Sequence, residues 1–202
     1  MVYSKKVFFK NHVVQVDEHV YEPAEDTLLI SELLKVEEDD VVLDVGTGCG
    51  ILSVLAAEKA KHVVAVDINP YAIECARKNA EVNGVEGKIE FRYGDLFHSI
   101  KPNEKFTLIL FNAPYLPSEP GEERDLIAKA WAGGQDGRKI IDRFVEGVSS
   151  YLAIGGRIQL IQSSLSDVNK TLDAFGKLGL KALIVAHVKV PFENIFLIEA
   201  RR

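Results

Sequence analysis

Four polar residues, each at or just after an apolar run, are candidates for joint chemistry. Asp44, Asp67, Asp95 and Asn112 belong to four different runs that have the length and composition of strands. A carboxylate accepts hydrogen bonds from ribose hydroxyls or an adenine amino group, and a carboxamide oxygen accepts them from a planar NH2 group. The carboxyl ends of parallel strands meet at one edge of a sheet, so these acceptors are expected to face one crevice.

A glycine turn positions the first two acids. The segment Val41–Gly50, VVLDVGTGCG, is an apolar run that ends in alternating glycines. A helix-length segment covers Ile51–Ala60, and a second apolar run, Val63–Asp67, ends in an acid. Strand, tight turn, helix and strand form the opening βαβ unit of a nucleotide-type cofactor fold. Because glycine allows close approach of the backbone to a ligand, Gly46 and Gly48 are candidate cofactor contacts.

The spacing of the glycines selects the cofactor. A dinucleotide fold uses G-x-G-x-x-G, whereas this chain has G-x-G-x-G with Asp44 two residues before the first glycine. That carboxylate would repel a pyrophosphate, which argues against a nicotinamide-linked oxidoreductase. It suits the ammonium and sulfonium of S-adenosylmethionine, and Asp67 suits the ribose. The prediction is therefore S-adenosyl-L-methionine, with a plain glycine turn that binds no cofactor as the structural alternative.

Four further residues complete the predicted cofactor site. Asp95 would accept a hydrogen bond from the adenine amino group, and Leu96 would offer its backbone amide. Ile68 would give an apolar face, and Thr27 would bond the amino-acid end of the cofactor. Structural alternatives are a strand cap for Asp95, core packing for Ile68 and a helix start for Thr27. The predicted contacts are Thr27, Asp44, Gly46, Gly48, Asp67, Ile68, Asp95, Leu96 and Asn112.

The sequence Asn112-Ala113-Pro114-Tyr115 is the predicted catalytic segment. An amide or aromatic amine nitrogen is a poor nucleophile because its lone pair is delocalised. The Asn112 side-chain oxygen and the Ala113 carbonyl can accept both N–H bonds and aim that lone pair at a methyl group. Pro114 would fix the backbone, and the ring of Tyr115 would lie against the substrate plane. The structural alternative is a β-turn with a buried tyrosine.

Composition limits the class of protein. The chain has 202 residues, 47% of them hydrophobic and 27% charged, as expected of one globular domain. Its net charge of −6 argues against nonspecific nucleic-acid binding. Cys49 and Cys75 have neither metal-site nor disulfide-framework spacing, which favours a reducing, cytoplasmic location and no metal. We find no signal-peptide pattern and no apolar run long enough to span a membrane.

The remaining pattern predicts an α/β fold. Residues 1–38 are expected to form a cap, with strands at Lys5–Phe9 and His12–Val16 and a helix from Pro23 to about Val36; residues 39–202 form the main domain. Alternating strands and helices followed by a terminal antiparallel pair predict a doubly wound sheet. Further strands are expected at Lys88–Tyr93, Phe106–Phe111, Gly156–Ile161, Leu180–Val190 and Phe192–Glu199, and helices at Asn69–Val82, Lys139–Leu152 and Ser166–Leu178.

The motifs VLDVGTGCG, VDINP, GDLF and NAPY, in this order and spacing, resemble the HemK-like protein-glutamine N5-methyltransferases. VYEPAEDTLL at Val20–Leu29 and AWAGGQDGRKIIDRF at Ala130–Phe144 look like the smaller archaeal and eukaryotic branch. The resemblance implies a Rossmann-like, class I S-adenosylmethionine-dependent methyltransferase fold with a seven-stranded, mostly parallel sheet. It covers the chain from about residue 19 to its end.

The resemblance also implies a substrate and a partner. The branch methylates the Gly-Gly-Gln glutamine of class I peptide-chain release factors, and some relatives work with a small zinc-binding activator subunit. Such a subunit would extend the sheet at Lys88–Tyr93, whose alternating apolar and charged residues suit an edge strand. One departure concerns catalysis: the family has Asn-Pro-Pro-Tyr where this chain has Ala113. Alanine keeps the carbonyl but releases the restriction on φ.

Other functions remain open at this point. N6-adenine methylation of DNA or RNA would use the same acceptor pair, although the acidic balance and the lack of a basic arm argue against it. Protein lysine methylation is another alternative, but a lysine amine does not need the two acceptors offered by Asn112 and Ala113. A catalytically weak, cofactor-binding scaffold is the non-enzymatic alternative, and the departure at Ala113 favours it.

Overall fold

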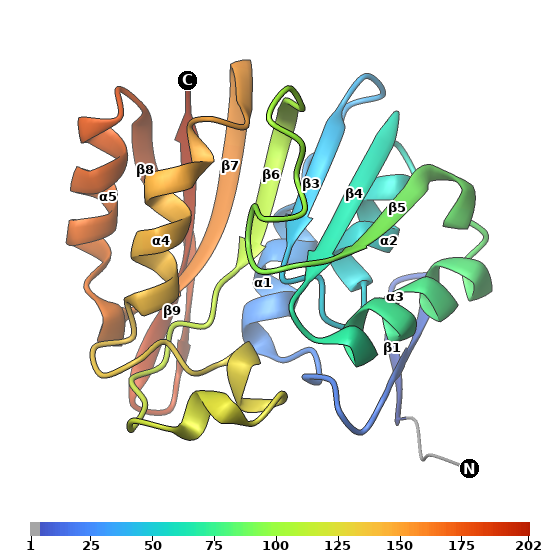
Figure 1. Cartoon of the computed structure of the whole chain (residues 1–202), viewed down its shortest axis with the longest axis horizontal. Coiled ribbons are helices and arrows are strands. Elements are labelled where there is room, and N and C mark those ends of the chain that lie inside the picture. The colour runs from blue at the N-terminus through green and yellow to red at the C-terminus, as the bar shows by residue number, and fades with distance from the viewer. Residues whose placement is uncertain (1–4) are drawn as a thin grey trace.

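The computed structural model describes residues 5–202, so the first four residues of the predicted 1–38 cap lie outside the described residues. A seven-stranded sheet with strand order β5-β4-β3-β6-β7-β9-β8 forms the centre of the molecule (Figure 1). Its strands are β3 (Val41–Val45), β4 (His62–Asp67), β5 (Ile89–Tyr93), β6 (Phe106–Asn112), β7 (Leu152–Ser163), β8 (Lys181–Val190) and β9 (Glu193–Arg201).

The sheet is mostly parallel, as predicted. The strands from β5 to β7 pair in parallel, and β9 runs antiparallel to both β7 and β8. The strand β6 lies at the centre, and its residues 108–111 are buried, which explains its continuous apolar sequence. The strand β5 lies at one edge, as its alternating sequence predicts. The predicted doubly wound α/β fold is therefore confirmed.

Helices cover both faces of the sheet. Right-handed crossovers place α2 and α3 on one face and α4 on the other, beside α5 (Figure 1). The helix α1 contacts α2 and packs on β6–β9. The helices are α1 (Glu25–Leu33), α2 (Ile51–Ala57), α3 (Pro70–Val82), α4 (Lys139–Val148) and α5 (Val168–Lys177), with 3-10 turns at Glu86–Lys88, Glu122–Arg124, Ala128–Ala130 and Ser164–Ser166.

The N-terminal hairpin, β1 (Lys5–Phe9) and β2 (His12–Val16), forms its own two-stranded sheet and docks on α3. Two asparagines, one in α3 and one directly after its end, make the connection through reciprocal hydrogen bonds with the β2 backbone. The Asn79 carboxamide donates to the Gln15 carbonyl at 2.7 Å and accepts from its N–H at 2.8 Å. Asn83 does the same with Val13, at 2.9 and 3.3 Å. These side chains act as a strand partner for an otherwise unpaired backbone.

Element boundaries differ from the predictions mainly around Gly155-Gly156. The sequence predicts that α4 runs to Leu152 and that a strand begins at Gly156, but the helix ends at Val148 and β7 already begins at Leu152. The pairing of β6 with β7 shifts register between Phe106 and Leu108, so the two glycines lie in an irregular stretch within a longer strand. Gly155 has φ +75°, which allows this bulge.

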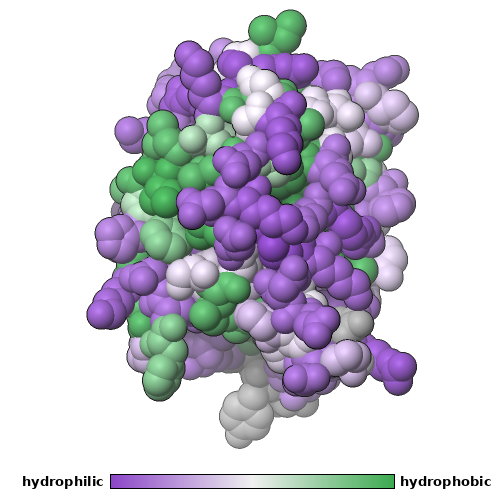
Figure 2. All heavy atoms as spheres, turned by 90° about the vertical axis from the view of Figure 1, so that its left-hand side faces the viewer, coloured by the Kyte–Doolittle hydropathy of each residue, from purple (hydrophilic) through white to green (hydrophobic). Residues whose placement is uncertain are grey.

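The strand β8 forms the sheet edge opposite β5. It exposes three consecutive apolar residues, Leu183, Ile184 and Val185. The view onto this side of the molecule shows apolar side chains gathered on one half and polar side chains over the rest (Figure 2). Within residues 5–202, no helix combines the length and apolar character needed to cross a membrane.

A comparison of two glycines, Gly50 and Gly84, tests why the turn before α2 needs glycine. Gly50 (φ +85°) and Gly84 (φ +69°) both have left-handed backbone, but a Cβ on Gly50 would lie 2.7 Å from the Ala76 Cβ, whereas one on Gly84 would meet nothing within 4 Å. Gly84→Ala should cost about 1–2 kcal/mol of unfolding free energy from backbone strain alone. Gly50→Ala should cost about 1–3 kcal/mol more because α2 and α3 must separate. Urea unfolding measures both, and equal losses would contradict the packing explanation.

Candidate active site

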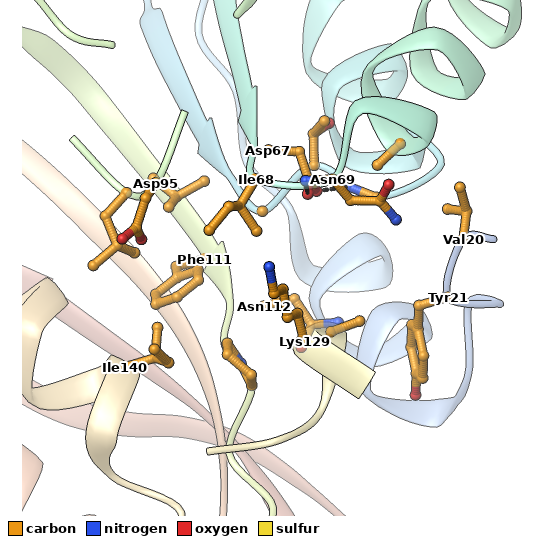
Figure 3. A pocket seen from close by; sticks show the side chains of 18 of the residues that line it. Val20, Tyr21, Asp67, Ile68, Asn69, Asp95, Phe111, Asn112, Lys129 and Ile140 are labelled. Carbon is orange, nitrogen blue, oxygen red and sulfur yellow. Dashed lines mark hydrogen bonds between the residues drawn. The ribbon is translucent and has the colours of Figure 1, made fainter. Parts of the chain in front are cut away.

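A pocket of about 250 Å³ opens at the carboxyl ends of the strands. Val45, Asp67 and Asn112, the last residues of β3, β4 and β6, all line it, and so does Asp95 beyond the end of β5 (Figure 3). The crevice expected from the strand ends therefore exists. Apolar surface makes up most of its wall, which suits a flat aromatic ligand held by a few polar groups.

Asp67 is held rigidly at the end of β4. One carboxylate oxygen accepts the Gly48 N–H at 2.9 Å and the other accepts the Asn69 N–H at 2.8 Å. Burial raises the pKa of Asp67, and backbone hydrogen bonds from Asn69, Gly48 and Ile68 oppose the shift. A carboxylate has about four acceptor positions, so acceptor capacity remains for a ligand hydroxyl group. Ile68, the next residue, also lines the pocket.

Asp44 lies behind the glycine turn, and it is not among the residues that line the pocket. It is 1% exposed, and its Oδ2 atom accepts hydrogen bonds from the hydroxyls of Thr47 at 2.7 Å and Ser53 at 2.6 Å. Its Oδ1 atom has no partner among the described residues. Burial raises the pKa of Asp44 to about 6, although the two hydroxyls oppose the shift. This geometry therefore does not favour direct contact between Asp44 and a ligand.

Asp95 pairs with an arginine that sequence reasoning missed. The Arg143 Nη2 atom of α4 donates to Asp95 Oδ2 at 2.7 Å, and both residues line the pocket. That hydrogen bond uses Asp95 Oδ2, and the second carboxylate oxygen can accept a further hydrogen bond. Leu96 follows with φ +50°, an unusual backbone for leucine, and it also lines the pocket. Arg143 is separated from Asp95 by 48 residues, so no local motif signals their contact.

The predicted catalytic segment divides between the pocket and the core. Asn112 and Pro114 line the pocket, whereas Ala113 and Tyr115 are buried behind it, 2% and 7% exposed. The Asn112 Nδ2 atom donates to Thr27 Oγ1 at 3.1 Å, and Asn112 Oδ1 is buried without a partner among the described residues. The Tyr115 hydroxyl donates to Asp26 Oδ2 at 3.1 Å. The tyrosine ring therefore supports the segment from behind and is not among the lining residues.

The structure brings together most of the predicted site. Seven predicted cofactor contacts besides Asn112 line the pocket, namely Thr27, Gly46, Gly48, Asp67, Ile68, Asp95 and Leu96. Sequence reasoning did not predict Lys129 or Tyr21 in the pocket (Figure 3). Lys129 lies in the 3-10 turn Ala128–Ala130, and Tyr21 lies in the irregular segment before α1. Among the side chains that the structure describes, no group of three histidine, cysteine or acidic residues is placed to bind a metal.

Comparison with known proteins identifies the family. A model of the methyltransferase small domain matches residues 24–183. A Methanocaldococcus jannaschii protein, named for protein N5-glutamine methyltransferase activity, is 46% identical over 91% of this chain and 92% of its own length. Human methyltransferase HEMK2 is 33% identical over 81% of this chain and 82% of its own length.

A solved structure agrees with these relatives. The E. cuniculi Mtq2-Trm112 complex, described as responsible for methylation of the translation termination factor eRF1, superposes with a TM-score of 0.72. The sequence identity is 27%, and the match covers 91% of this chain and 99% of the other. The likeness therefore extends over most of this chain.

The buried carboxylate of Asp44 predicts an inverted dependence of stability on pH in the ligand-free protein. Burial raises its pKa from the ordinary 3.8 to about 6, so the folded state holds a proton that the unfolded state has lost. The Asp44 contribution should therefore fall as pH rises from about 4 to about 6, by up to about 3 kcal/mol. Asp44→Asn should remove this part of the fall, whereas the part due to the raised pKa of Asp67 stays, as measured by urea unfolding at several pH values.

A matched control is Asp39→Asn, which also removes one carboxylate but at an exposed position. It should leave the pH profile of the wild type unchanged. If Asp44→Asn kept the wild-type fall between about pH 4 and 6, the assignment of this effect to Asp44 would be wrong.

Proposed function

This chain belongs to the protein N5-glutamine methyltransferases of the methyltransferase small domain family, and we propose that it transfers a methyl group from S-adenosyl-L-methionine to a glutamine side-chain amide. The observation that carries the proposal is the Asn112 carboxamide. Its nitrogen is bonded to Thr27, and its oxygen is buried and has no partner among the described residues. An unpaired buried acceptor at the end of a pocket suits a donor on the substrate.

The pocket residues fit an adenosyl cofactor. Asp67 would accept the ribose hydroxyls with the lone pairs that Gly48 and Asn69 leave free. The free oxygen of Asp95 would accept the adenine amino group, and Leu96 would offer its N–H to the ring. Ile68 would pack on the adenine face, and the amino-acid end would lie toward Thr27, Gly46 and Gly48. Asp44 would act through its negative charge from behind the turn, where low dielectric strengthens its attraction for a cation.

The catalytic residues would act on the substrate nitrogen. Bound S-adenosylmethionine supplies an activated methyl group on a sulfonium. The Asn112 oxygen and the Ala113 carbonyl would accept the two N–H bonds of the glutamine amide and direct its lone pair along the S–CH3 axis. The amide nitrogen would take the methyl group from the bound cofactor and release one proton to solvent. Pro114 and Tyr115 would keep the segment in place.

We propose the Gly-Gly-Gln glutamine of a class I peptide-chain release factor as the substrate. Support comes from the Mtq2-Trm112 complex described above and from a Bacillus cereus release factor glutamine methyltransferase, 32% identical over 75% of this chain and 56% of that protein. A substrate of translation termination and the two free cysteines, Cys49 and Cys75, fit a cytoplasmic location.

The β5 edge is the proposed site for a small activator subunit. Among the described residues, β5 has a strand neighbour only on its β4 side, and Tyr93 at its end is 64% exposed. A partner strand could therefore pair with the free side of β5. Trm112 in the E. cuniculi complex supports a small partner, and zinc binding by that partner is part of the proposal.

We also propose that residues 1–38 act as a cap on a methyltransferase unit formed by residues 39–202. Val20, Tyr21 and Thr27 of this segment line the pocket opposite the strand ends. The Asn69 side chain donates to the His19 carbonyl at 2.7 Å and joins the segment to the end of β4. The cap would shield the reacting atoms from water.

The substrate assignment predicts specific labelling of one residue. The chain, with tritiated S-adenosylmethionine, should methylate a class I release factor, and the Gly-Gly-Gln Gln→Asn variant of that factor should take up no label. Asn112→Ala should lower kcat by at least about 100-fold because an acceptor that works in the transition state is lost. Calorimetric titration should give nearly unchanged cofactor affinity for Asn112→Ala and much weaker binding for Asp67→Ala.

Duplex DNA and a lysine-rich protein serve as competing acceptors in the same assay, with the activator subunit present and absent. Labelling of DNA at adenine, or of lysine in place of glutamine, would overturn the glutamine assignment. Cofactor binding without transfer to any acceptor would support a catalytically weak scaffold.

A further inference from the structure

The buried carboxylate of Asp26 contacts two residues of the predicted site, Thr27 and Tyr115, and has no role in the mechanism above. It is 4% exposed, and it forms no ion pair with a lysine, arginine or histidine among the described residues. Its place in the first turn of α1 eases the burial, because the N-terminal end of a helix favours negative charge. A buried charge without a cation is costly, so its other contacts are informative.

Those contacts reach both ends of the catalytic segment. Asp26 Oδ1 accepts the Thr27 N–H at 2.5 Å and the Thr27 hydroxyl at 3.1 Å, and Asp26 Oδ2 accepts the Tyr115 hydroxyl at 3.1 Å. The Thr27 hydroxyl in turn accepts Asn112 Nδ2 at 3.1 Å. One carboxylate is therefore linked to Asn112 through Thr27 and to Tyr115 directly.

The direction of each hydrogen bond follows from the donors present. Asp26 Oδ1 accepts the Thr27 N–H and also the Thr27 hydroxyl, which thereby donates its only hydrogen to Asp26. The Thr27 oxygen is then left with lone pairs alone and can only accept from Asn112. This selects the carboxamide orientation in which the NH2 group of Asn112 faces Thr27 and the oxygen is free. The proposed catalysis needs that orientation, because an NH2 group cannot accept a hydrogen bond from the substrate amide.

The contact between Asp26 and Tyr115 restrains the catalytic segment, which contains Ala113. Ala113 leaves the backbone freer than proline would at that position. The hydrogen bond from Tyr115 to Asp26 fixes the end of the segment against α1, which is 89 residues earlier in the chain. Both ends of the four-residue segment are then held by one side chain and its neighbour.

We propose that Asp26 is a positioning residue for methyl transfer, which sets the orientation of the Asn112 carboxamide through the Thr27 hydroxyl. The proposal rests on the function proposed above. Asp26 acts only through other residues, so its loss should reduce the rate of the chemical step and leave the cofactor pocket intact. A purely structural helix-capping role would change stability without changing kcat of the folded enzyme.

The test is Asp26→Asn, which keeps the size of the side chain but adds a donor. With that donor present, the Thr27 hydroxyl can turn its hydrogen toward Asn112 and reverse the carboxamide. At saturating cofactor and release factor, kcat should fall about 10- to 100-fold, while cofactor affinity changes by less than about threefold. Glu25→Gln is the matched control, because Glu25 is an exposed carboxylate in the same helical turn. It should leave kcat unchanged.

A double-variant cycle separates positioning from an independent effect. Thr27→Val removes the hydroxyl and already breaks the link to Asn112. Adding Asp26→Asn to Thr27→Val should therefore lower kcat by no more than about threefold further. If the two losses multiplied in full, Asp26 would not act through Thr27, and the proposal would be wrong.

The remaining outcomes are also decisive. Full kcat in folded Asp26→Asn would overturn the role of Asp26 alone, whereas failure of the wild type to label the glutamine would overturn the proposed function. If thermal unfolding showed that Asp26→Asn is not folded, variants of Thr27 would be used to test the hydroxyl link in its place. Thr27→Ser should then restore at least about 10-fold of the kcat lost in Thr27→Val, and no restoration would contradict the hydroxyl link.

Discussion

The hydrogen bond from the Asn112 side chain to the Thr27 hydroxyl is the contact on which the site depends. It joins the end of β6 to the first turn of α1, across 85 residues of sequence. A terminal carboxamide has two nearly equivalent orientations, and only a directional partner selects one of them. With its nitrogen bonded, Asn112 has its oxygen free at the place where strand ends and helix start enclose the pocket.

The parallel sheet provides the other half of the arrangement. Parallel pairing of β3 with β4 and β6, and of β4 with β5, brings the ends of four strands to one edge. Asp44 is buried there and Asp67 is half-buried, and desolvation raises the pKa of each. The folded protein accepts this cost at a site where a cation would remove it. Such opposition between stability and function is typical of binding sites built before their ligand arrives.

Sequence patterns could predict the parts of the site that depend on strand ends. Asp67, Asp95 and Asn112 stand at chain positions that any parallel sheet would bring together, and the glycine spacing marks the turn beside them. The patterns could not predict contacts between side chains far apart in sequence. Arg143 carries no motif that points to Asp95, and Asp26 looks like an ordinary acid at a helix start. Gly155-Gly156 marked a strand boundary in the sequence but forms a bulge, because pairing with β6 continues beyond it.

The central claim is that Asn112 presents its oxygen, and not its nitrogen, to the substrate amide. The most direct measurement is a crystal structure of the chain with S-adenosylhomocysteine and a Gly-Gly-Gln peptide. The account predicts that the glutamine side-chain nitrogen lies about 3 Å from Asn112 Oδ1 and from the Ala113 carbonyl oxygen, with Asn112 Nδ2 still on Thr27. A glutamine amide outside this range, or an Asn112 nitrogen that faces the peptide, would contradict it.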